Sequence, residues 1–581
     1  MSSPAPLAVG WVRRWLALPA LFTSLALLMV RPTRLDRLPD NLGDPALIVW
    51  IMSWAGKGLV SQPAHLFDAP MFWPHGSTFA YADVLATPAV PYWALYGATG
   101  SWTVSLIGVS LLFTVLAEVG AYAAALRITG RRDAAVVAAV AFAFSGYALG
   151  RWASLQLGSL GILALCLVAF LHLLDRPSAR RGLLLGAAIA LTFYASAYYG
   201  ALLLLLLALL APVILIVRLV RHDPSARRLL GGLAVAAALG GTLILPTALV
   251  SLRLQRDLHL ERALAPEFDL VPRDLLRPTA GSYVWNRLDV PAPRASYEHR
   301  FFPGAIAALL GGVGVVAVGA RLARRRPVGP DERPRAGRDL GVLAVAGLIS
   351  LLLAKGSSGI GSVSPWKLVH AHLPGFGGIQ ATSRLAVPAL LLGAVLASVG
   401  YAAATERLRS RRRLPMAPLV LCTSLILLDL SASRTWAPLD TSKERLAVYH
   451  ALEARPAGAV LELPMPDPRV EPQTWAFQEA PRLLYSTLDW HPRVNGYSGF
   501  LPPGYTEDLE AYRQFPEPVA IERLRSRRVR YVILHVGLEN GFPGLSEADA
   551  TDRLRRLPPG ASSTNEGASR LIDLGPGAGS W

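Results

Sequence analysis

The chain has 581 residues, of which 52% are hydrophobic and 17% are charged, and its mean hydropathy is +0.38. Because soluble domains carry about a quarter charged residues, this composition excludes an ordinary soluble protein, and it also excludes a disordered chain, collagen and a coiled coil. The net charge is +17, but the basic residues fall mostly between apolar segments, so we expect no nucleic-acid partner. Cys166 and Cys422 lie within apolar runs and predict neither a disulfide nor a thiolate metal site.

Apolar windows of membrane-spanning length recur along the chain. The first has no small-residue cleavage site, so we interpret it as a retained helix and not as a signal peptide. The predicted spans lie near residues 15–31, 103–127, 133–150, 155–174, 181–199, 200–219, 229–250, 303–322, 339–354, 384–404 and 414–431. The fold class predicted is therefore a polytopic α-helical membrane protein with about eleven transmembrane helices.

The basic residues lie in alternate loops between these spans. They occur near 127–132, 176–181, 218–228, 321–326 and 407–413. The positive-inside rule makes these loops cytoplasmic, and Arg13 and Arg14 before the first span agree with that assignment. We therefore expect a multi-pass protein of the inner (plasma) membrane, with its N-terminus in the cytoplasm and everything after about residue 432 outside.

The predicted outer loops 32–102, 251–302 and 355–383 are longer and rich in Pro, Gly, Trp, Tyr, His and Asp. Long ordered loops are usually functional. In the first of them, Asp44-Pro45 before an apolar run predicts an amphipathic helix on the outer leaflet, with Asp44 as its N-cap. Residues 85–98 are apolar but contain two prolines, which indicates a short interfacial or re-entrant helix.

The pattern changes after about residue 432. Short apolar runs predict strands at Val460–Leu463, Arg530–His535 and Arg570–Leu574. Helical periodicity favours helices at Lys443–Arg455 and Val519–Arg528. We therefore predict two domains: a transmembrane domain over 1–431, which includes the outer loop 32–102, and a small extracytoplasmic α/β domain over 432–581.

Five cations lie at the predicted outer ends of spans, where the positive-inside rule makes Lys and Arg least needed: Arg151, Arg253, Arg256, Lys355 and Arg384. One interpretation is snorkelling or pairing with loop carboxylates. The other is that several converge on an anionic headgroup, because guanidinium groups bind phosphate oxygens in bidentate fashion. Arg384, which opens a span after Thr382-Ser383, fits the second interpretation best, and Lys355 in Lys355–Gly359 is next.

Other charged residues near the membrane leave two interpretations open. Glu298-His299-Arg300 precedes a span and suits either phosphate binding and leaving-group stabilisation or an ordinary juxtamembrane ion pair. Glu118 is a carboxylate deep in an early span, which makes it a functional candidate, although pairing with a hydroxyl or with Arg127 is the commoner case. His259, His370 and His372 show no metal-ligand spacing with each other or with the cysteines, so we expect no metal site.

Acids gather in the first outer loop: Asp40, Asp44, Asp68 and Asp83. Asp44 is either a helix N-cap or a general base that takes a proton from a hydroxyl. Asp83 is either a second acid, which orients an acceptor or holds a cation, or a solvated loop carboxylate. We select Asp44 and Asp83 as the candidate catalytic acids.

Several short motifs follow one another in a characteristic order. They are Gly43-Asp44-Pro45 with Trp50 and Trp54, Leu66-Phe67-Asp68, Phe72-Trp73-Pro74, Asp83, Phe142–Tyr147, Pro374-Gly375-Phe376 before Ser383-Arg384, and Asn495–Gly499. This order resembles the GT-C superfamily, the polytopic glycosyltransferases that use polyprenyl-phosphate sugars at the outer face of the membrane, and it is most similar to bacterial members. One departure concerns the position after Tyr147, where relatives often carry a histidine and this chain has Trp152–Gln156.

The resemblance implies inverting transfer of a sugar from a polyprenyl-phosphate donor to a glycan, lipid or protein acceptor outside the cytoplasm. It implies Asp44 as the catalytic base and Arg384 as the best match for a lipid-phosphate ligand. We add Lys355, Arg151, Arg256, His299 and Arg300 as candidate substrate-binding residues. No nucleotide or other cofactor is expected, and a divalent cation is left open.

Two other functions stay open at this stage. A lipid-linked glycan flippase or transporter would also have many spans with basic residues at their mouths, but transporters usually contain paired repeats, and the sequence contains none. A scaffold that binds cell-wall glycan would need far fewer spans for anchoring. We therefore favour the transferase over both alternatives.

Overall fold

The computed structural model describes residues 7–259, 262–287, 298–323, 334–361, 363–409 and 416–575. Contacts divide the chain into two compact units. The described residues within Met1–Thr33, Gly108–Leu249 and Glu261–Arg434 form one, called here the helical unit. Those within Arg34–Ile107, Val250–Leu260 and Thr435–Trp581 form the other, called here the mixed unit.

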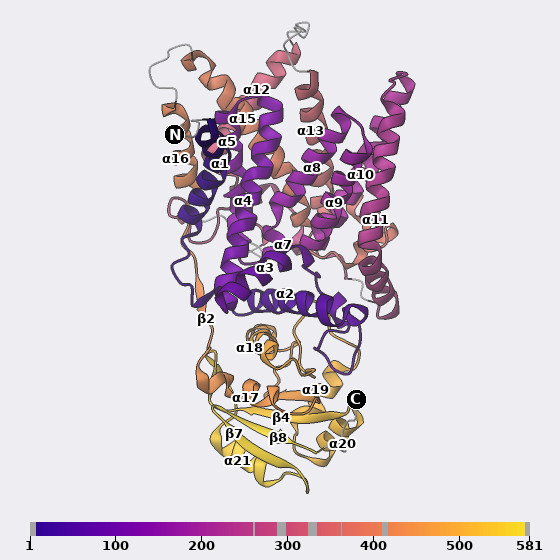
Figure 1. Cartoon of the computed structure of the whole chain (residues 1–581), viewed down its shortest axis with the longest axis vertical. Helices are drawn as coiled ribbons and strands as arrows, with labels where there is room; N and C mark the ends of the chain where they lie inside the picture. The colour runs from indigo at the N-terminus through magenta and orange to yellow at the C-terminus, as the bar shows by residue number, and fades with distance from the viewer. Residues whose placement is uncertain are drawn as a thin grey trace, which may run out of the picture. The chain divides into compact units, whose positions relative to one another are not determined.

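The helical unit is built from long apolar helices and three short ones (Figure 1). They are α1 (Leu7–Val30), α4 (Trp102–Thr129), α5 (Arg132–Ala143), α6 (Gly146–Gly150), α7 (Leu155–Gly158), α8 (Leu160–Asp175), α9 (Ala179–Ala195), α10 (Ala197–Val220), α11 (Ala226–Asp257), α12 (Ala305–Ala323), α13 (Pro334–Ala354), α14 (Pro365–His372), α15 (Val387–Arg409) and α16 (Ala417–Leu430). Short 3-10 turns join them: η3 (Pro266–Phe268), η4 (Pro272–Leu276), η6 (Gly356–Ser358), η7 (Phe376–Gly378) and η8 (Thr382–Ala386). Two of the long helices, α4 and α11, extend at one end into residues of the mixed unit.

Every predicted span coincides with one of these helices or with two helices separated by a short turn. Within the described residues, 8 helical segments are long and apolar enough to cross a membrane, and Ala17–Val30 and Ala417–Leu430 are shorter apolar helices. The prediction of a polytopic helical membrane protein is confirmed.

The helices differ in how far the protein itself covers them. In the segment Arg132–Gly150, 83% of the apolar window is buried, against 22% for α11 and 11% for α12. The exposed leucines and valines of α11 and α12 need an apolar solvent, which a bilayer supplies. Helices α12 and α15 pack closely, because a Cβ on Gly400 would lie 1.9 Å from the Leu310 carbonyl oxygen.

Ion pairs bring the predicted cytoplasmic loops to one end of the helical unit. Arg127 at the end of α4 contacts Asp175 at the end of α8 (2.8 Å) and Asp339 near the start of α13 (2.6 Å). Arg131 before α5 donates to the Ala402 carbonyl in α15 (2.8 Å). These basic ends therefore share one side, as predicted. Their orientation toward the cytoplasm stays a prediction, and the basic stretches 324–333 and 410–415 lie outside the described residues.

The mixed unit combines a four-stranded sheet with helices from two parts of the chain (Figure 1). Its sheet has the order β3-β4-β8-β7, in which β3 and β4 are parallel and the other pairs antiparallel. Its helices and turns are α2 (Asp44–Ser61), η1 (Pro63–His65), η2 (Thr78–Tyr81), α3 (Ala86–Thr99), α17 (Lys443–Glu453), α18 (Pro472–Tyr485), η9 (Ser486–Leu488), α19 (Tyr505–Arg513), α20 (Pro518–Ser526) and α21 (Glu547–Arg555). Its strands are β1 (Arg37–Pro39), β2 (Trp436–Pro438), β3 (Ala459–Leu463), β4 (Val529–His535), β5 (Leu538–Glu539), β6 (Phe542–Pro543), β7 (Ser562–Glu566) and β8 (Ser569–Asp573).

All three predicted strands and both predicted helices after residue 432 are present, as β3, β4, β8, α17 and α20. The sequence did not predict β7, because it is a polar, exposed edge strand without alternating hydrophobic residues. It also missed α18, whose buried face contains charged and amide side chains that hide the helical pattern.

Helix α2 confirms the predicted helix after Asp44 but corrects two details. Gly43 is the N-cap, and Asp44 stands in the first turn without a capping hydrogen bond. All residues from Pro45 to Ala55 are buried, so the helix is not amphipathic. The reason is that α2 packs against both α3 and α18, which together cover its surface.

Residues Arg34–Ile107 belong to the same unit as the C-terminal part of the chain, whereas the sequence analysis assigned residues 32–102 to the transmembrane domain. Backbone pairing joins β1 to β2, and the Phe72 amide donates to the Asn495 carbonyl (3.1 Å). The ring centroids of Trp54 and Trp490 lie 5.7 Å apart. The boundary between Arg434 and Thr435 lies close to the predicted start at 432.

A buried network of charges fills the core of the mixed unit. Arg482 contacts Glu539 (2.6 Å) and Glu479 (2.9 Å), and Arg493 contacts Glu462 (2.7 Å). Burial raises the pKa of Glu479 to about 8, although Arg482 opposes that shift. One carboxyl oxygen of Glu479, Oε2, has no hydrogen-bond partner among the described residues.

Glu479 should make the protein less stable as the pH rises. In the unfolded chain this carboxyl ionises near its ordinary pKa of 4.5, whereas in the folded protein it holds its proton until about pH 8. The folded state therefore binds more protons between these values, and stability falls across the window. Glu479→Gln should remove this dependence. The melting temperature of the wild type in detergent should therefore fall relative to that of the variant as the pH rises from 5 to 8. Exposed Glu522 offers the control Glu522→Gln; equal pH profiles for all three proteins would contradict the prediction.

Candidate functional site

Asp44 is exposed at the start of α2, where its side chain is held by one aromatic hydroxyl. The Tyr497 hydroxyl donates to Asp44 Oδ1 at 3.1 Å. The Tyr497 ring packs edge-on against Trp475 of α18, with centroids 4.8 Å apart. The second carboxyl oxygen, Oδ2, makes no hydrogen bond within the described residues. An exposed carboxylate held through one oxygen is able to take a proton with the other.

The motif Asn495–Gly499 connects the two candidate acids of the first outer loop. Its Asn495 amide donates to the Glu462 carbonyl (2.9 Å) and so fixes the motif to β3. Next to Tyr497, Ser498 donates to the Tyr81 carbonyl (3.0 Å), two residues before Asp83. Asp83 itself is half-buried between η2 and α3. The two acids therefore lie in segments that contact neighbouring residues of one motif.

In the helical unit, Glu298 lies between two of the predicted phosphate ligands. Its Oε2 contacts Arg151 Nη2 at 2.6 Å, and its Oε1 contacts Arg384 Nη2 at 2.7 Å. We call Arg151, Glu298 and Arg384 the outer triad. Arg384 also lies over the ring of Tyr198, at 4.9 Å from the centroid. Glu298 is fully buried, whereas the Arg384 side chain stays 20% exposed.

The outer triad keeps a net positive charge. Burial alone raises the pKa of Glu298, but the guanidinium groups of Arg384 and Arg151 outweigh burial and hold this pKa below its ordinary value. The carboxylate is thus ionised and neutralises one of the two cations, so one positive charge remains. Guanidinium groups in a poorly hydrated site are well suited to bind phosphate oxygens.

Asp269 holds the loop that carries Lys355 next to the segment that carries Arg384. This buried carboxylate accepts hydrogen bonds from Ser357 Oγ (2.9 Å), Ser358 Oγ (2.7 Å) and Thr382 Oγ1 (2.9 Å). A Cβ on Gly356, which has φ +55°, would lie 1.6 Å from Asp269 Oδ1, so only glycine fits there. Lys355 is half-buried, and its ammonium has no partner among the described residues.

The remaining candidates differ in how far they are free to bind a ligand. His299 is buried, with Nδ1 at 2.8 Å from Asp274 Oδ2 and Nε2 at 2.7 Å from the Glu267 carbonyl. Burial lowers the pKa of His299, but the Asp274 carboxylate and the carbonyl outweigh burial and raise it. Arg300 is half-buried and has a partner in the protein, whereas Arg256 is exposed on the last turn of α11, in the mixed unit.

Two further expectations concern acids and metals. Glu118 is fully buried in α4, and neither of its carboxyl oxygens has a hydrogen-bond partner within the described residues. It is therefore not paired with Arg127, which contacts Asp175 and Asp339 instead.

In the part of the chain that the structure describes, no three His, Cys, Asp or Glu residues are placed to hold a metal ion.

The structure thus joins Arg151 and Arg384 through Glu298, and it links the Lys355 loop to the Arg384 segment through Asp269. Asp44 and Asp83 belong to the mixed unit. Sequence reasoning missed Asp269 and the role of Tyr497. A carboxylate isolated between apolar stretches, as in Phe268-Asp269-Leu270, and the tyrosine of the Asn495–Gly499 motif were the available signals.

Comparison with known proteins identifies the fold. No model of a protein family matches the chain, and no curated protein does. The arabinofuranosyltransferase AftD from Mycobacteria aligns with 97% of this chain and 40% of its own, at a TM-score of 0.53 and 16% identity. A second structure, class 2 of an AftD mutant, aligns with 97% of this chain and with 42% of the AftD chain, at a TM-score of 0.55 and 17% identity. The chain has the GT-C fold.

The GT-C fold extends over nearly the whole chain, which spans about 40% of the AftD chain. ArnT from Cupriavidus metallidurans bound to undecaprenyl phosphate aligns over 99% of both chains at 13% identity, with a TM-score of only 0.44. At these identities the likeness establishes the fold alone. The predicted resemblance to the GT-C superfamily is confirmed at that level.

Removing the central carboxylate of the outer triad should destabilise the helical unit. In Glu298→Ala, two guanidinium groups lose their buried partner, which costs about 3–5 kcal/mol for a buried ion pair. The melting temperature in detergent should therefore fall clearly, whereas Glu267→Ala, at an exposed position nearby, should leave it unchanged. Equal melting temperatures for both variants would show that the triad does not stabilise the fold.

Proposed function

We propose that this protein is an integral-membrane glycosyltransferase that moves a sugar from a polyprenyl-phosphate donor to an acceptor outside the cytoplasm. The GT-C fold supports membership in this class of enzyme. The observation that carries the proposal is the outer triad, in which a buried carboxylate fixes two guanidinium groups with one net positive charge. Arg151 of the triad follows α6. It therefore stands at the opposite end of the segment Arg132–Gly150 from Arg131, which contacts α15 at the predicted cytoplasmic side.

In the proposed reaction Asp44 is the general base. Its free Oδ2 takes the proton of an acceptor hydroxyl, and the resulting oxygen forms a bond to the anomeric carbon of the sugar. The bond between that carbon and the phosphate oxygen breaks on the opposite face, and its electron pair leaves with the polyprenyl phosphate. One displacement of this kind inverts the anomeric centre. Tyr497 positions the base through Oδ1, and we assign Asp83 to the orientation of the acceptor.

Arg384 and Arg151 stabilise the departing phosphate in this mechanism. Charge that develops in a poorly hydrated site is stabilised most by donors that are already oriented, and Glu298 together with Tyr198 orients Arg384. Lys355, whose ammonium has no protein partner among the described residues, is the second proposed phosphate ligand.

The other predicted binding residues take lesser parts. We assign His299 a positioning role, because both its ring nitrogens are occupied by protein groups and it adjoins Glu298. Arg300 and Arg256 remain proposed contacts to the donor headgroup. No nucleotide is needed, because the polyprenyl phosphate already activates the sugar, and we propose no resident metal or cofactor.

Liposomes test the proposed function directly. Purified protein is reconstituted and supplied with a radiolabelled polyprenyl-phosphate sugar and a panel of glycan, lipid and peptide acceptors. Transfer predicts release of unlabelled polyprenyl phosphate and labelled acceptor. Label that crosses the bilayer without release of the carrier would instead indicate a flippase, and binding with neither result would indicate a scaffold; either outcome would overturn the proposal.

Asp44→Asn should abolish measurable transfer while the amount of protein in the membrane stays unchanged. The amide keeps a hydrogen-bond acceptor for Tyr497 but takes no proton, and a general base contributes about 10²–10⁴-fold in rate. Product formation is measured with donor and acceptor at saturation. The control Asp36→Asn changes an exposed acid of the same outer segment and should retain full activity; near-normal turnover by Asp44→Asn would remove the assigned base.

Arg384→Ala should impair use of the lipid donor far more than use of the acceptor. Hydrogen bonds to charged groups contribute about 1.5–3 kcal/mol, so the KM for the donor should rise about tenfold or more. The two KM values are measured separately and compared with those of Arg273→Ala, which alters an exposed arginine of the same unit. Equal rises in both KM values for Arg384→Ala would mean that this residue is only structural.

A further inference from the structure

The mixed unit contains a cavity that the proposed reaction does not use. It has a volume of about 300 Å³ and lies where the chain leaves the carboxyl end of β3, at Leu463-Pro464-Met465. In open α/β sheets, ligands bind preferentially outside the carboxyl ends of the strands. Its size falls at the lower end of the range of small-molecule sites.

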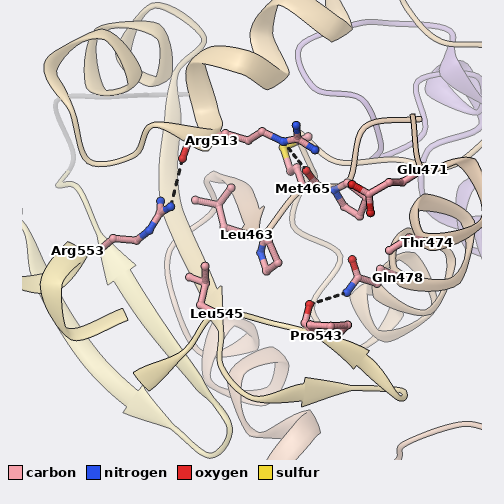
Figure 2. A pocket seen from close by; sticks show the side chains of 11 residues that line it. Leu463, Met465, Glu471, Thr474, Gln478, Arg513, Pro543, Leu545 and Arg553 are labelled. Atoms are coloured by element: carbon pink, nitrogen blue, oxygen red, sulfur yellow. Dashed lines mark hydrogen bonds between the residues drawn. The ribbon is translucent and has the colours of Figure 1, made fainter. Parts of the chain in front are cut away.

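Two kinds of surface face each other across this cavity. Figure 2 shows the polar side chains of Glu471, Thr474 and Gln478 along one side, with Leu463 and Leu545 opposite and the Arg513 side chain extending across the top. Thr474 and Gln478 belong to α18 and Glu471 immediately precedes it; spacings of three and four residues place all three on one helix face.

The polar groups of the cavity are only partly satisfied by the protein. Gln478 donates to the Pro543 carbonyl (3.2 Å), and Arg513 Nε donates to the Met465 carbonyl (2.8 Å). Glu471 and Arg513 are exposed and Thr474 is half-buried. Within the described residues, the Glu471 carboxylate, the Thr474 hydroxyl and both Nη groups of Arg513 make no hydrogen bond or ion pair to the protein, so they are open to a ligand from solvent. Glu471 and Arg513 therefore line one cavity without forming an ion pair, and a ligand with both donors and acceptors would bridge them.

The charge of the cavity restricts the ligand. Arg553 also lines it, but donates one Nη to the Phe515 carbonyl and the other to the Arg513 carbonyl (3.2 Å). These carbonyl acceptors leave the charge of Arg553 in place, so the lining carries one carboxylate and two guanidinium groups, a net charge of +1. A single net positive charge is too little to match the several negative charges of a polyphosphate. A ring with hydroxyls around its rim and apolar C–H faces would match the polar groups on one side and the leucines on the other.

We propose that this cavity binds one sugar unit of a glycan, with Glu471 accepting from hydroxyls, Arg513 donating to them, and Leu463 and Leu545 covering an apolar face of the ring. The identification of the glycan as the acceptor rests on the proposed function. The binding of a sugar does not, because it requires neither donor nor transfer. The cavity would hold the glycan at a second position, apart from the reacting hydroxyl.

The test measures the binding of free sugars to the full-length protein in detergent, without any lipid donor. Saturation-transfer NMR is recorded with glucose, galactose, mannose, N-acetylglucosamine, arabinose and glucuronate. A single sugar unit with few contacts should bind with a dissociation constant of about 1 mM. Glu471→Gln should weaken binding at least several-fold, and Thr474→Trp, which fills the cavity, should abolish it. Both changes are at positions that are not fully buried, and melting temperatures verify that the variants fold.

Glu522→Gln is the matched control, because Glu522 is exposed on α20 and does not line the cavity. Saturable binding that survives in this control and is lost in Thr474→Trp supports the proposal. Absence of saturable binding for all six sugars, or binding that Thr474→Trp leaves unchanged, overturns it. Either negative result would leave transfer from the lipid donor intact in the liposome assay, so a failure of this proposal is distinguishable from a failure of the proposed function.

Discussion

The buried carboxylate of Glu298 is the constraint on which the predicted outer end of the helical unit depends. Two guanidinium groups so near each other would repel in an environment of low dielectric constant unless an anion lay between them. Glu298 supplies that anion through both oxygens, at 2.6 Å from Arg151 and 2.7 Å from Arg384. It thereby fixes two side chains that come from distant parts of the sequence, and it leaves one positive charge uncompensated. An uncompensated charge that is already oriented suits a phosphate ligand.

Polar side chains also hold loops in place beside the triad and in the mixed unit. Asp269 gathers hydroxyl groups from two loops, and Asp274 contacts both His299 and Arg277. In the mixed unit Asn495 binds the edge of β3, and the adjoining Tyr497 then reaches Asp44. The contacts of Asp269, Asp274 and Asn495 are buried, and such contacts are costly to break because a partner left alone stays desolvated. The contact between Tyr497 and Asp44 is exposed.

The sequence predicted the helices and the main strands because their hydrophobic patterns are set by the solvent that each element faces. It also predicted Arg151 and Arg384 as unusual cations, from their positions at the outer ends of spans. It could not predict that Glu298 lies between them, since that pairing depends on tertiary packing. For the same reason it misjudged α2, because a helix covered by α3 and α18 looks no different in sequence from one that lies on a membrane. The polar edge strand β7 and the partly charged helix α18 carry no hydrophobic period that sequence reasoning can detect.

In the proposed mechanism the lipid phosphate binds at the outer triad. A polyprenyl phosphate analogue with a photoreactive group next to its phosphate is bound to the purified protein, irradiated, and the modified peptides are mapped by mass spectrometry. If the phosphate binds there, adducts form in the segments around Arg151, Glu298 and Arg384, and excess undecaprenyl phosphate prevents their formation. Competable adducts confined to other segments, with none near these three residues, would contradict this mechanism.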